Sequence, residues 1–317
     1  MQGKPSAVPP RLYRGRPHGR SMRTYWQLYL MLLIPMLFLF VFKYGSYFGL
    51  AAAFENYKIL KGVLGSKWVG FANFVKVFNH RRFGDAIRNT LLLNVLDLAF
   101  GFPMPIILAL MLNEIRHRLV KRTTQTLLYL PHFLSWVIVG AIAYQLLTYG
   151  TGVVNDIIER LGGRRVPFLQ EDWHWLASYV LIGVWQSMGW GTIVYLAAIT
   201  SINPELYEAA VVDGAGRWKQ CLNITLPCIR PTMVTLFIMR LGQLMGGSFE
   251  RVIALKNVAT NEFTYTIPVM VYDMGLQSGT SKIAQATALG MFQSVIGVLL
   301  VIGADRLAKS LGEDGLL

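Results

Sequence analysis

Charged side chains are scarce in this chain of 317 residues. Only 15% of the residues are Asp, Glu, Lys or Arg, and 54% are hydrophobic, whereas soluble domains carry roughly 25% charged residues. The apolar residues are gathered in blocks of about 20, the length at which a helix crosses the hydrocarbon core of a bilayer. The composition therefore excludes an ordinary soluble domain and predicts an all-α, polytopic membrane protein.

Acidic residues and cysteines are scarcer still. The chain has 17 Asp and Glu against 30 Lys and Arg, a formal net charge of +13. Such a charge suits nucleic acid, but the basic residues lie mostly beside the apolar blocks, where Lys and Arg orient a protein and meet anionic lipid. We therefore expect contact with membrane lipid and no nucleic-acid partner. Cys221 and Cys228 have no Cys or His neighbours at metal-ligand spacing, so we expect neither a metal site nor a disulfide.

Motifs for ATP binding and for hydrolysis are also missing. No Gly-x-x-x-x-Gly-Lys-Ser/Thr loop is present to hold the phosphates of ATP, and neither His-Glu-x-x-His nor Gly-x-Ser-x-Gly occurs. We therefore expect that the chain is not an enzyme and binds no cofactor. Any ATP and magnesium that drive its function must be bound by a separate subunit.

Six apolar blocks predict six membrane-spanning helices. The expected spans are residues 25–45, 89–113, 124–149, 175–200, 232–255 and 284–304. A basic tail without acids, residues 1–25, precedes the membrane domain, which is expected over residues 26–317. The tail and the short basic loop at residues 114–122 belong in the cytosol. This orientation places both termini and the polar segment 201–230 on the cytosolic side.

The segment between the first two spans carries an apolar stripe of its own. Phe71, Phe74 and Phe78 recur at helical spacing. The pattern suits a helix lying in the membrane interface, and it equally suits a helix packed against the outer ends of the spans.

The polar segment 201–230 carries the most specific pattern. Its fixed elements are Glu208, Ala209, Ala210, Asp213, Gly214, Ile224, Leu226 and Pro227. Three residues separate Glu-Ala-Ala from the glycine, and nine separate the glycine from Ile-x-Leu-Pro. This spacing resembles the cytoplasmic coupling loop of binding-protein-dependent ABC importer permeases, the loop that docks on the ATPase subunit. We call residues 201–230 the coupling loop.

Local signals predict a helix–turn–helix within the coupling loop. Asn203 and Pro204 favour a helix start, because Asn caps a helix and Pro suits its first position. Gly214 favours its end, since Gly accepts the left-handed conformation. A second short helix is expected at residues 216–223, presenting Arg217 to the ATPase, and Pro227 and Pro231 would bracket the return into the bilayer.

The resemblance implies a type I ABC importer architecture and a set of partners. These are a second permease subunit, two ATP-binding subunits and an extracytoplasmic solute-binding protein, assembled at a bacterial inner membrane. Residues 26–43 and 68–74 look like the sugar and polysaccharide branch, with the alginate importer permease as a possible likeness. The implied function is import of a carbohydrate. An ion-gradient-driven secondary transporter and an ABC permease for a non-sugar solute are the alternatives.

Polar side chains within spans indicate a substrate path, because they are costly unless they face a cavity or a partner. The expected path residues are Asn94, Asp97, Trp185, Gln186, Trp190, Arg240, Gln243 and Glu250. In a continuous fifth span, Arg240, Gln243 and Glu250 would share one helical face. Gly242 and Gly246 would form a small-residue pair for close helix packing. A purely structural pair of Arg240 with Asp97 is the alternative.

Overall fold

The computed structural model describes residues 25–256, 261–278, 282–313 and 315–316. The predicted basic tail therefore lies almost wholly outside the described residues. The chain divides into two compact units, Met1–Ala51 and Ala52–Leu317, and each is described by itself.

The described part of the first unit is one apolar helical run. It begins with α2 (Trp26–Phe38), continues through the π turns of η2 (Leu39–Tyr44) and enters the 3-10 helix η3 (Gly45–Phe54). No side chain of α2 or η2 is buried within the chain. A helix that is hydrophobic on all sides requires an apolar surrounding, either lipid or another subunit. The run reaches beyond the predicted end of the first span at residue 45.

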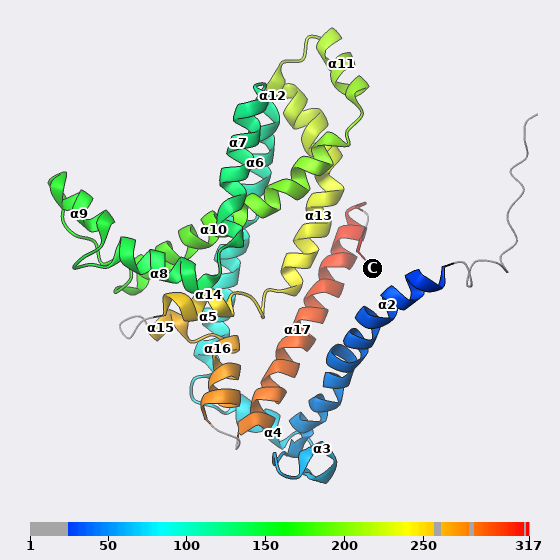
Figure 1. Cartoon of the computed structure of the whole chain (residues 1–317), viewed down its shortest axis with the longest axis vertical. Coiled ribbons are helices and arrows are strands. Elements are labelled where there is room, and N and C mark those ends of the chain that lie inside the picture. The colour runs from blue at the N-terminus through cyan, green and yellow to red at the C-terminus, as the bar shows by residue number, and fades with distance from the viewer. Residues whose placement is uncertain (1–24, 257–260, 279–281, 314, 317) are drawn as a thin grey trace, which may run out of the picture. The chain divides into compact units, whose positions relative to one another are not determined.

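The second unit is almost entirely helical (Figure 1). Its two short strands, β1 (Glu55–Asn56) and β2 (Lys67–Trp68), form an antiparallel pair. The helices before the coupling loop are α3 (Gly62–Gly65), α4 (Ala72–Phe78), α5 (Phe83–Leu96), η4 (Asp97–Gly101), α6 (Pro103–Glu114), α7 (Arg118–Tyr129), η5 (Leu130–Phe133), α8 (Trp136–Leu147), α9 (Val153–Arg160) and α10 (Asp172–Thr200). Those that follow are α11 (Pro204–Val212), α12 (Arg217–Gln220), η6 (Cys221–Thr225), α13 (Leu226–Gly242), α14 (Phe249–Leu255), α15 (Asn261–Thr264), α16 (Ile267–Tyr272), η7 (Asp273–Gln277) and α17 (Ile283–Ser310).

Within the described residues, five helical runs are long and apolar enough to cross a membrane, and one bent pair makes up to six. The five are Trp26–Phe54, Phe83–Glu114, Asp172–Thr200, Arg217–Gly242 and Ile283–Ser310. These runs correspond to the predicted spans one, two, four and six with shifted ends, whereas Arg217–Gly242 covers only the first part of the predicted fifth span.

The predicted third span, residues 124–149, corresponds to a bent pair of helices and not to one straight helix. Arg118–Phe133 and Trp136–Leu147 are bent by 102° at the break between them. Pro131 stands just before the break, where its missing N–H interrupts the helical hydrogen bonds. Ser135 then starts a new helix, because its side chain accepts a hydrogen bond from the backbone N–H of Ile138 at 3.4 Å.

Two apolar clusters hold the second unit together. The larger cluster joins α5, α10, α14, α16 and α17 around fully buried Trp175 and Leu289. The Trp175 indole N–H also donates to the Leu255 carbonyl at 2.8 Å, which ties α10 to the end of α14. The smaller cluster joins α6, α10 and α13 around Ile229. Ile202 and Leu226 of the coupling loop pack against this cluster.

The helix α4 packs against the last span. The Phe78 ring lies 5.3 Å from the Phe292 ring of α17 and 5.2 Å from the Phe83 ring of α5, measured between centroids. Of the two interpretations of this aromatic stripe, packing against the ends of the spans therefore accounts for Phe78. Phe71 and Phe74 contact Phe54 instead.

Candidate functional site

The coupling loop begins with the predicted capped helix. The Asn203 side chain accepts a hydrogen bond from the backbone N–H of Glu205 at 3.1 Å, and Pro204 occupies the first turn of α11. Gly214 ends the helix in the left-handed conformation, with φ of 74°. The backbone N–H of Ala215 donates to the Ala210 carbonyl at 2.8 Å, which closes the turn. Both local predictions are confirmed.

The return from the loop differs from the prediction. The second helix begins at Arg217 but does not end at residue 223, because α12, η6 and α13 follow without interruption. The π turns of η6 lie directly before Pro227, whose missing N–H disturbs the ordinary helical ladder. Pro231 lies inside α13 rather than at its boundary.

One side-chain contact ties the coupling loop to a span, and a second joins two parts of the loop itself. Arg217 forms an ion pair with Glu114 at the end of α6, with 2.6 Å between Nη1 and Oε2. The Tyr207 hydroxyl lies 2.9 Å from the Thr225 hydroxyl, which joins α11 to η6. The ion pair thus links α12 to α6, and the hydrogen bond links α11 to η6, which continues into α13. Arg217 holds the loop in place by its contact with α6, a structural role not foreseen for this residue.

The outer surface of the loop is open to a partner. Glu208, Ala209 and Asp213 are exposed, and Val212 is 88% exposed. Ile224 and Leu226, by contrast, are partly buried, and Leu226 packs against the smaller apolar cluster. The motif of the coupling loop thus has an exposed half, at residues 208–214, and an anchoring half, at residues 224–227, which packs into the helix bundle through Leu226.

A second site lies where the predicted fifth span breaks. Residues 232–255 do not form one helix, because α13 ends at Gly242 and α14 begins only at Phe249. Three glycines within residues 242–247 weaken the helix at this point. Ser248 has φ of 70° and, among the described residues, is the one non-glycine with a positive φ. Broken helices within a membrane domain are tolerated where they line a cavity or are covered by protein.

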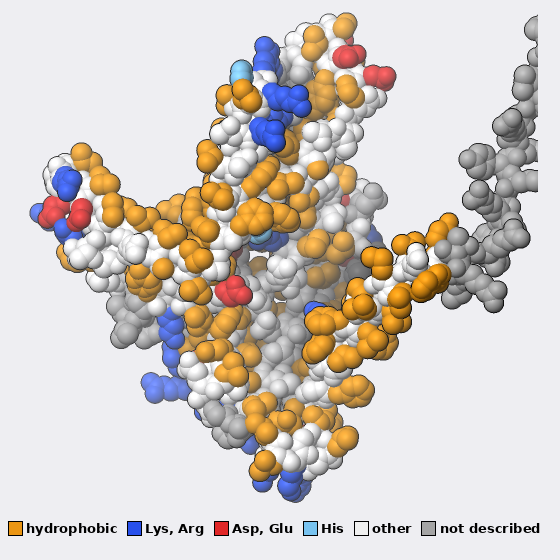
Figure 2. Space-filling model, viewed as in Figure 1, with side chains coloured by type: hydrophobic (Ala, Val, Ile, Leu, Met, Phe, Trp, Pro, Cys, Tyr) orange, Lys and Arg blue, Asp and Glu red, His pale blue; other side chains and the backbone are white. Residues whose placement is uncertain are grey.

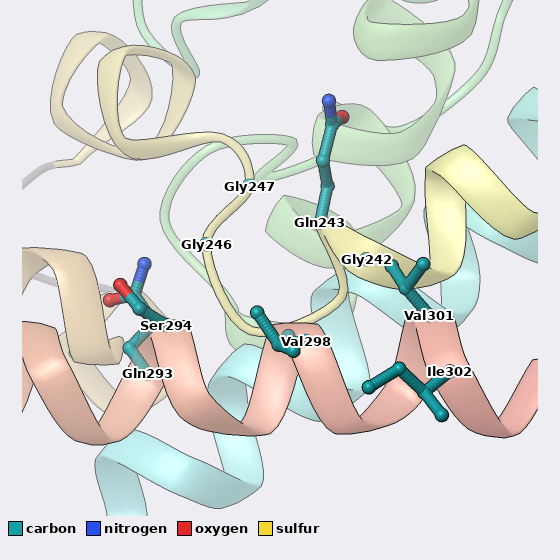
Figure 3. A pocket seen from close by; sticks show the side chains of 10 residues that line it. Gly242, Gln243, Gly246, Gly247, Gln293, Ser294, Val298, Val301 and Ile302 are labelled. Carbon is teal, nitrogen blue, oxygen red and sulfur yellow. The ribbon is translucent and has the colours of Figure 1, made fainter. Parts of the chain in front are cut away.

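The loop after α13 lies close to α17. A side chain at Gly297 would bring its Cβ to 2.8 Å from the Gly242 carbonyl, and one at Gly246 would meet Gln293 at 2.7 Å. Gly242 and Gly246 therefore allow close packing against α17, as predicted, although Gly246 lies beyond the end of α13. A cavity of about 790 Å³ lies along this contact. Figure 3 shows the glycine loop on one side and side chains of α17 on the other, with Gln243 pointing away from α17.

A buried ion pair fixes the other end of the break. Arg251 on α14 pairs with Asp97 on η4, and their side chains are only 5% and 20% exposed. The Ser248 hydroxyl donates to Asp97 at 3.2 Å and accepts from Arg251 at 3.1 Å. The guanidinium carbon lies 3.7 Å from the centre of the Tyr179 ring. This cluster joins α5–η4, α10 and α14.

Two backbone features make room for the ion pair. A Cβ at Gly183 on α10 would collide with the Arg251 guanidinium. Asp97 itself begins a π-helical segment six residues before Pro103, and π bulges within helices are frequent at functional sites. The sequence thus combines a glycine and a helix distortion at one buried charge pair.

Two polar cavities of about 180 and 160 Å³ adjoin this cluster. Both are lined by Asp97, Ser248 and Arg240, and the second also by Asn94 and Gln243. Asp97 is occupied by Arg251, and Arg240 makes no ion pair with any residue that the structure describes. The cavities therefore combine an unpaired guanidinium with two amides and a hydroxyl, a set that suits hydroxyl and carboxylate groups.

A family model decides the identity of the chain. The family described as binding-protein-dependent transport system inner membrane component matches residues 101–312, well over half of the chain. The chain belongs to this family. It is a transport permease of the ABC importer class.

Relatives extend the match over nearly the whole permease. The polygalacturonan/rhamnogalacturonan transport system permease protein YteP of Bacillus subtilis (strain 168) is 43% identical over 91% of this chain and 89% of the relative. Protein LplB of the same organism is 41% identical over 93% and 92%. A crystal structure of a bacterial alginate ABC transporter in complex with alginate pentasaccharide-bound periplasmic protein contains a chain with 40% identity and a TM-score of 0.83, covering 94% of the permease and 99% of that chain. These findings confirm the predicted resemblance and the all-α, type I permease fold.

The permease brings together only half of the predicted substrate path. Asn94, Asp97, Arg240 and Gln243 meet at the polar cavities. Glu250 does not share their face, because it lies in the first turn of α14, is exposed and lines neither cavity. The common face of Arg240, Gln243 and Glu250 was therefore wrong, since it required an unbroken helix.

The aromatic part of the predicted path lies elsewhere in the permease. Trp190 stacks on the His132 ring at 5.0 Å, and Gln186 donates to the His132 carbonyl at 3.4 Å. Trp185 lines an apolar cavity with residues of α8. These side chains of α10 face η5 and α8, so the structure does not bring them to Arg240.

Arg251 is the residue that the sequence interpretation missed. The alternative pairing of Arg240 with Asp97 was wrong, because Asp97 pairs with Arg251. The sequence marks only the break: Arg251 lies four residues after Gly247, the last of the three glycines, and its partner is not evident from its position.

Proposed function

We propose that this permease imports an oligosaccharide into the cytosol, driven by ATP hydrolysis in a separate nucleotide-binding subunit. The observation that carries the proposal is the coupling loop, whose exposed helix α11 is hydrogen-bonded to η6 and whose helix α12 is ion-paired to α6. Such a tether transmits the movement of a docked subunit to the spans. Membership of the importer family supports the same conclusion.

The coupling residues are assigned from the exposed and anchored halves of the loop. Glu208, Ala209, Ala210 and Asp213 on α11 would face the ATPase, with Gly214 as the turn that shapes this surface. Ile224, Leu226 and Pro227 would anchor it, and Arg217 would fix it to α6. ATP and magnesium would be bound by the docked subunit.

The cargo is assigned from relatives and from the polar cavities. YteP is named for polygalacturonan and rhamnogalacturonan transport, and the similar solved transporter imports the acidic polysaccharide alginate. In this permease, Arg240 is an unpaired cation beside the amides of Asn94 and Gln243. An unpaired guanidinium within a membrane domain is costly unless an anion reaches it. An acidic oligosaccharide is therefore the cargo that the site suits best.

The remaining partners follow from the family architecture. The first unit and the glycine-lined cavity along α17 offer apolar surfaces for a second permease subunit. An extracytoplasmic solute-binding protein would deliver the cargo, as a periplasmic protein is bound in the similar alginate transporter. The termini and the coupling loop would lie in the cytosol of a bacterial cell, with the permease in its inner membrane.

ATP hydrolysis by defined combinations of subunits tests this proposal. The purified permease is expected to hydrolyse no ATP, and hydrolysis is expected when it is copurified with its nucleotide-binding subunits. Hydrolysis by the isolated permease, once contaminating ATPases are excluded, would refute the proposal that a separate subunit hydrolyses ATP.

A further inference from the structure

An apolar groove lies beside the coupling loop, where the end of α6 meets α12 and η6. Its volume is about 550 Å³, within the roughly 300–1,000 Å³ that is typical of ligand sites. Ile107, Leu110 and Met111 form one wall and Trp218 and Cys221 the other. Met111 is 61% exposed and Trp218 81% exposed, so the groove is open to the surroundings of the chain.

The groove runs from the end of α6 along the apolar run Phe83–Glu114, which is long enough to cross a membrane. At the polar end it is closed by the ion pair of Glu114 with Arg217. Ile107 lies about 10 Å deeper along α6, at 1.5 Å per residue. A hydrocarbon chain fits the apolar walls of such a groove.

Several cations lie close in sequence to Glu114 and Trp218, which line the groove. They are Arg116, Arg118, Lys121, Arg122 and Lys219, none of which forms an ion pair with a residue that the structure describes. The single acid of the groove lining, Glu114, is taken by Arg217. Figure 2 shows Lys and Arg side chains gathered over α7 and α12 at this end.

We propose that this groove binds an anionic glycerophospholipid. One acyl chain would lie between Ile107, Met111 and Trp218, and the phosphate would meet the guanidinium and ammonium groups of the loop that follows α6. Lys and Arg side chains near an anionic membrane surface are attracted to its headgroups. Trp218 suits the boundary, because Trp side chains favour the interface between hydrocarbon and headgroups. The lipid would stabilise the contact of α6 with α12 on which the coupling loop rests.

Fluorescence quenching in lipid nanodiscs tests the site. The full-length permease is placed in discs of phosphatidylcholine that contain, at equal mole fraction, either phosphatidylglycerol or phosphatidylcholine with dibrominated acyl chains. The Trp218 contribution is the difference between the wild-type protein and Trp218→Phe, which removes one of the 8 tryptophans. We expect at least twofold stronger quenching of this contribution by the brominated phosphatidylglycerol.

Charge removal provides the matched comparison. Arg118→Gln with Arg122→Gln is expected to abolish the preference for phosphatidylglycerol, and Arg164→Gln, an exposed arginine before α10, is expected to retain it. Equal quenching by both lipids would overturn the proposal. Loss of the phosphatidylglycerol signal when the nucleotide-binding or second permease subunits are added would also overturn it, since the groove would then belong to a protein partner. Thermal unfolding of each variant verifies that its fold is intact.

Discussion

Arg251 of α14 forms its ion pair with Asp97 of η4, across 154 positions of the chain. Both side chains are largely buried, and Ser248 bridges them. The pair fixes the end of the broken fifth span to the distorted second span, next to the polar cavities.

Neutralising one partner of this pair leaves a buried charge without compensation, which costs about 3–5 kcal/mol. We expect Asp97→Asn and Arg251→Gln each to lower the thermal unfolding temperature of the purified complex. In the double variant, the unfolding temperature is expected to fall by clearly less than the sum of the two single decreases. Strictly additive losses would show that the two side chains do not interact.

Gly183→Ala tests the packing around the same guanidinium. The added methyl group collides with Arg251, so we expect reduced yield of assembled complex and a lower unfolding temperature. Gly290→Ala on α17 is the matched control, because a Cβ there meets no atom within 4 Å. Equal behaviour of the two variants would contradict the packing described for Arg251.

The turn at Gly214 requires a positive φ of 74° but leaves space for a side chain. Gly214→Val is therefore expected to abolish stimulation of ATP hydrolysis by substrate, because a β-branched residue is strained in this conformation. Gly214→Asn is expected to retain most of it, since Asn tolerates the left-handed region. The measurement is the hydrolysis rate of the assembled complex with and without loaded binding protein. Normal stimulation in the valine variant would mean that the loop shape does not matter for coupling.

Arg240→Gln and Gln243→Ala test the polar cavities. A hydrogen bond to a charged group contributes about 1.5–3 kcal/mol, so loss of Arg240 is expected to lower uptake of an acidic oligosaccharide by roughly tenfold or more. Gln243→Ala is expected to lower uptake less, and basal ATP hydrolysis and assembly are expected to be unchanged in both. Glu250→Gln serves as the control, because Glu250 lines neither cavity. A larger loss in the Glu250 variant than in the Arg240 variant would favour the unbroken-helix interpretation.

The sequence predicts local structure well where a single residue dominates it. Asn203, Pro204 and Gly214 define α11 and its turn because capping and left-handed conformation are local properties. The break after Gly242 was missed because apolar residues resume at positions 252–255, although three glycines mark the position. The pairing of Asp97 with Arg251 could not be derived, since it depends on how the restarted helix α14 packs against α10.

The bend in the third predicted span likewise depends on tertiary packing, which the sequence does not reveal. Pro131 and Ser135 mark a helix end and a helix start, but the 102° angle between the two segments follows from tertiary packing. Hydrophobic length alone could not separate one straight span from two shorter helices at an angle.

Uptake into proteoliposomes tests the central claim most directly. The vesicles would contain the permease with its second permease subunit and nucleotide-binding subunits, and the binding protein would be loaded with a labelled oligogalacturonide outside. We predict accumulation that requires ATP at the nucleotide-binding subunits, requires the binding protein and persists when ion gradients are collapsed. Accumulation driven by a proton or sodium gradient without ATP would contradict the account and identify a secondary transporter.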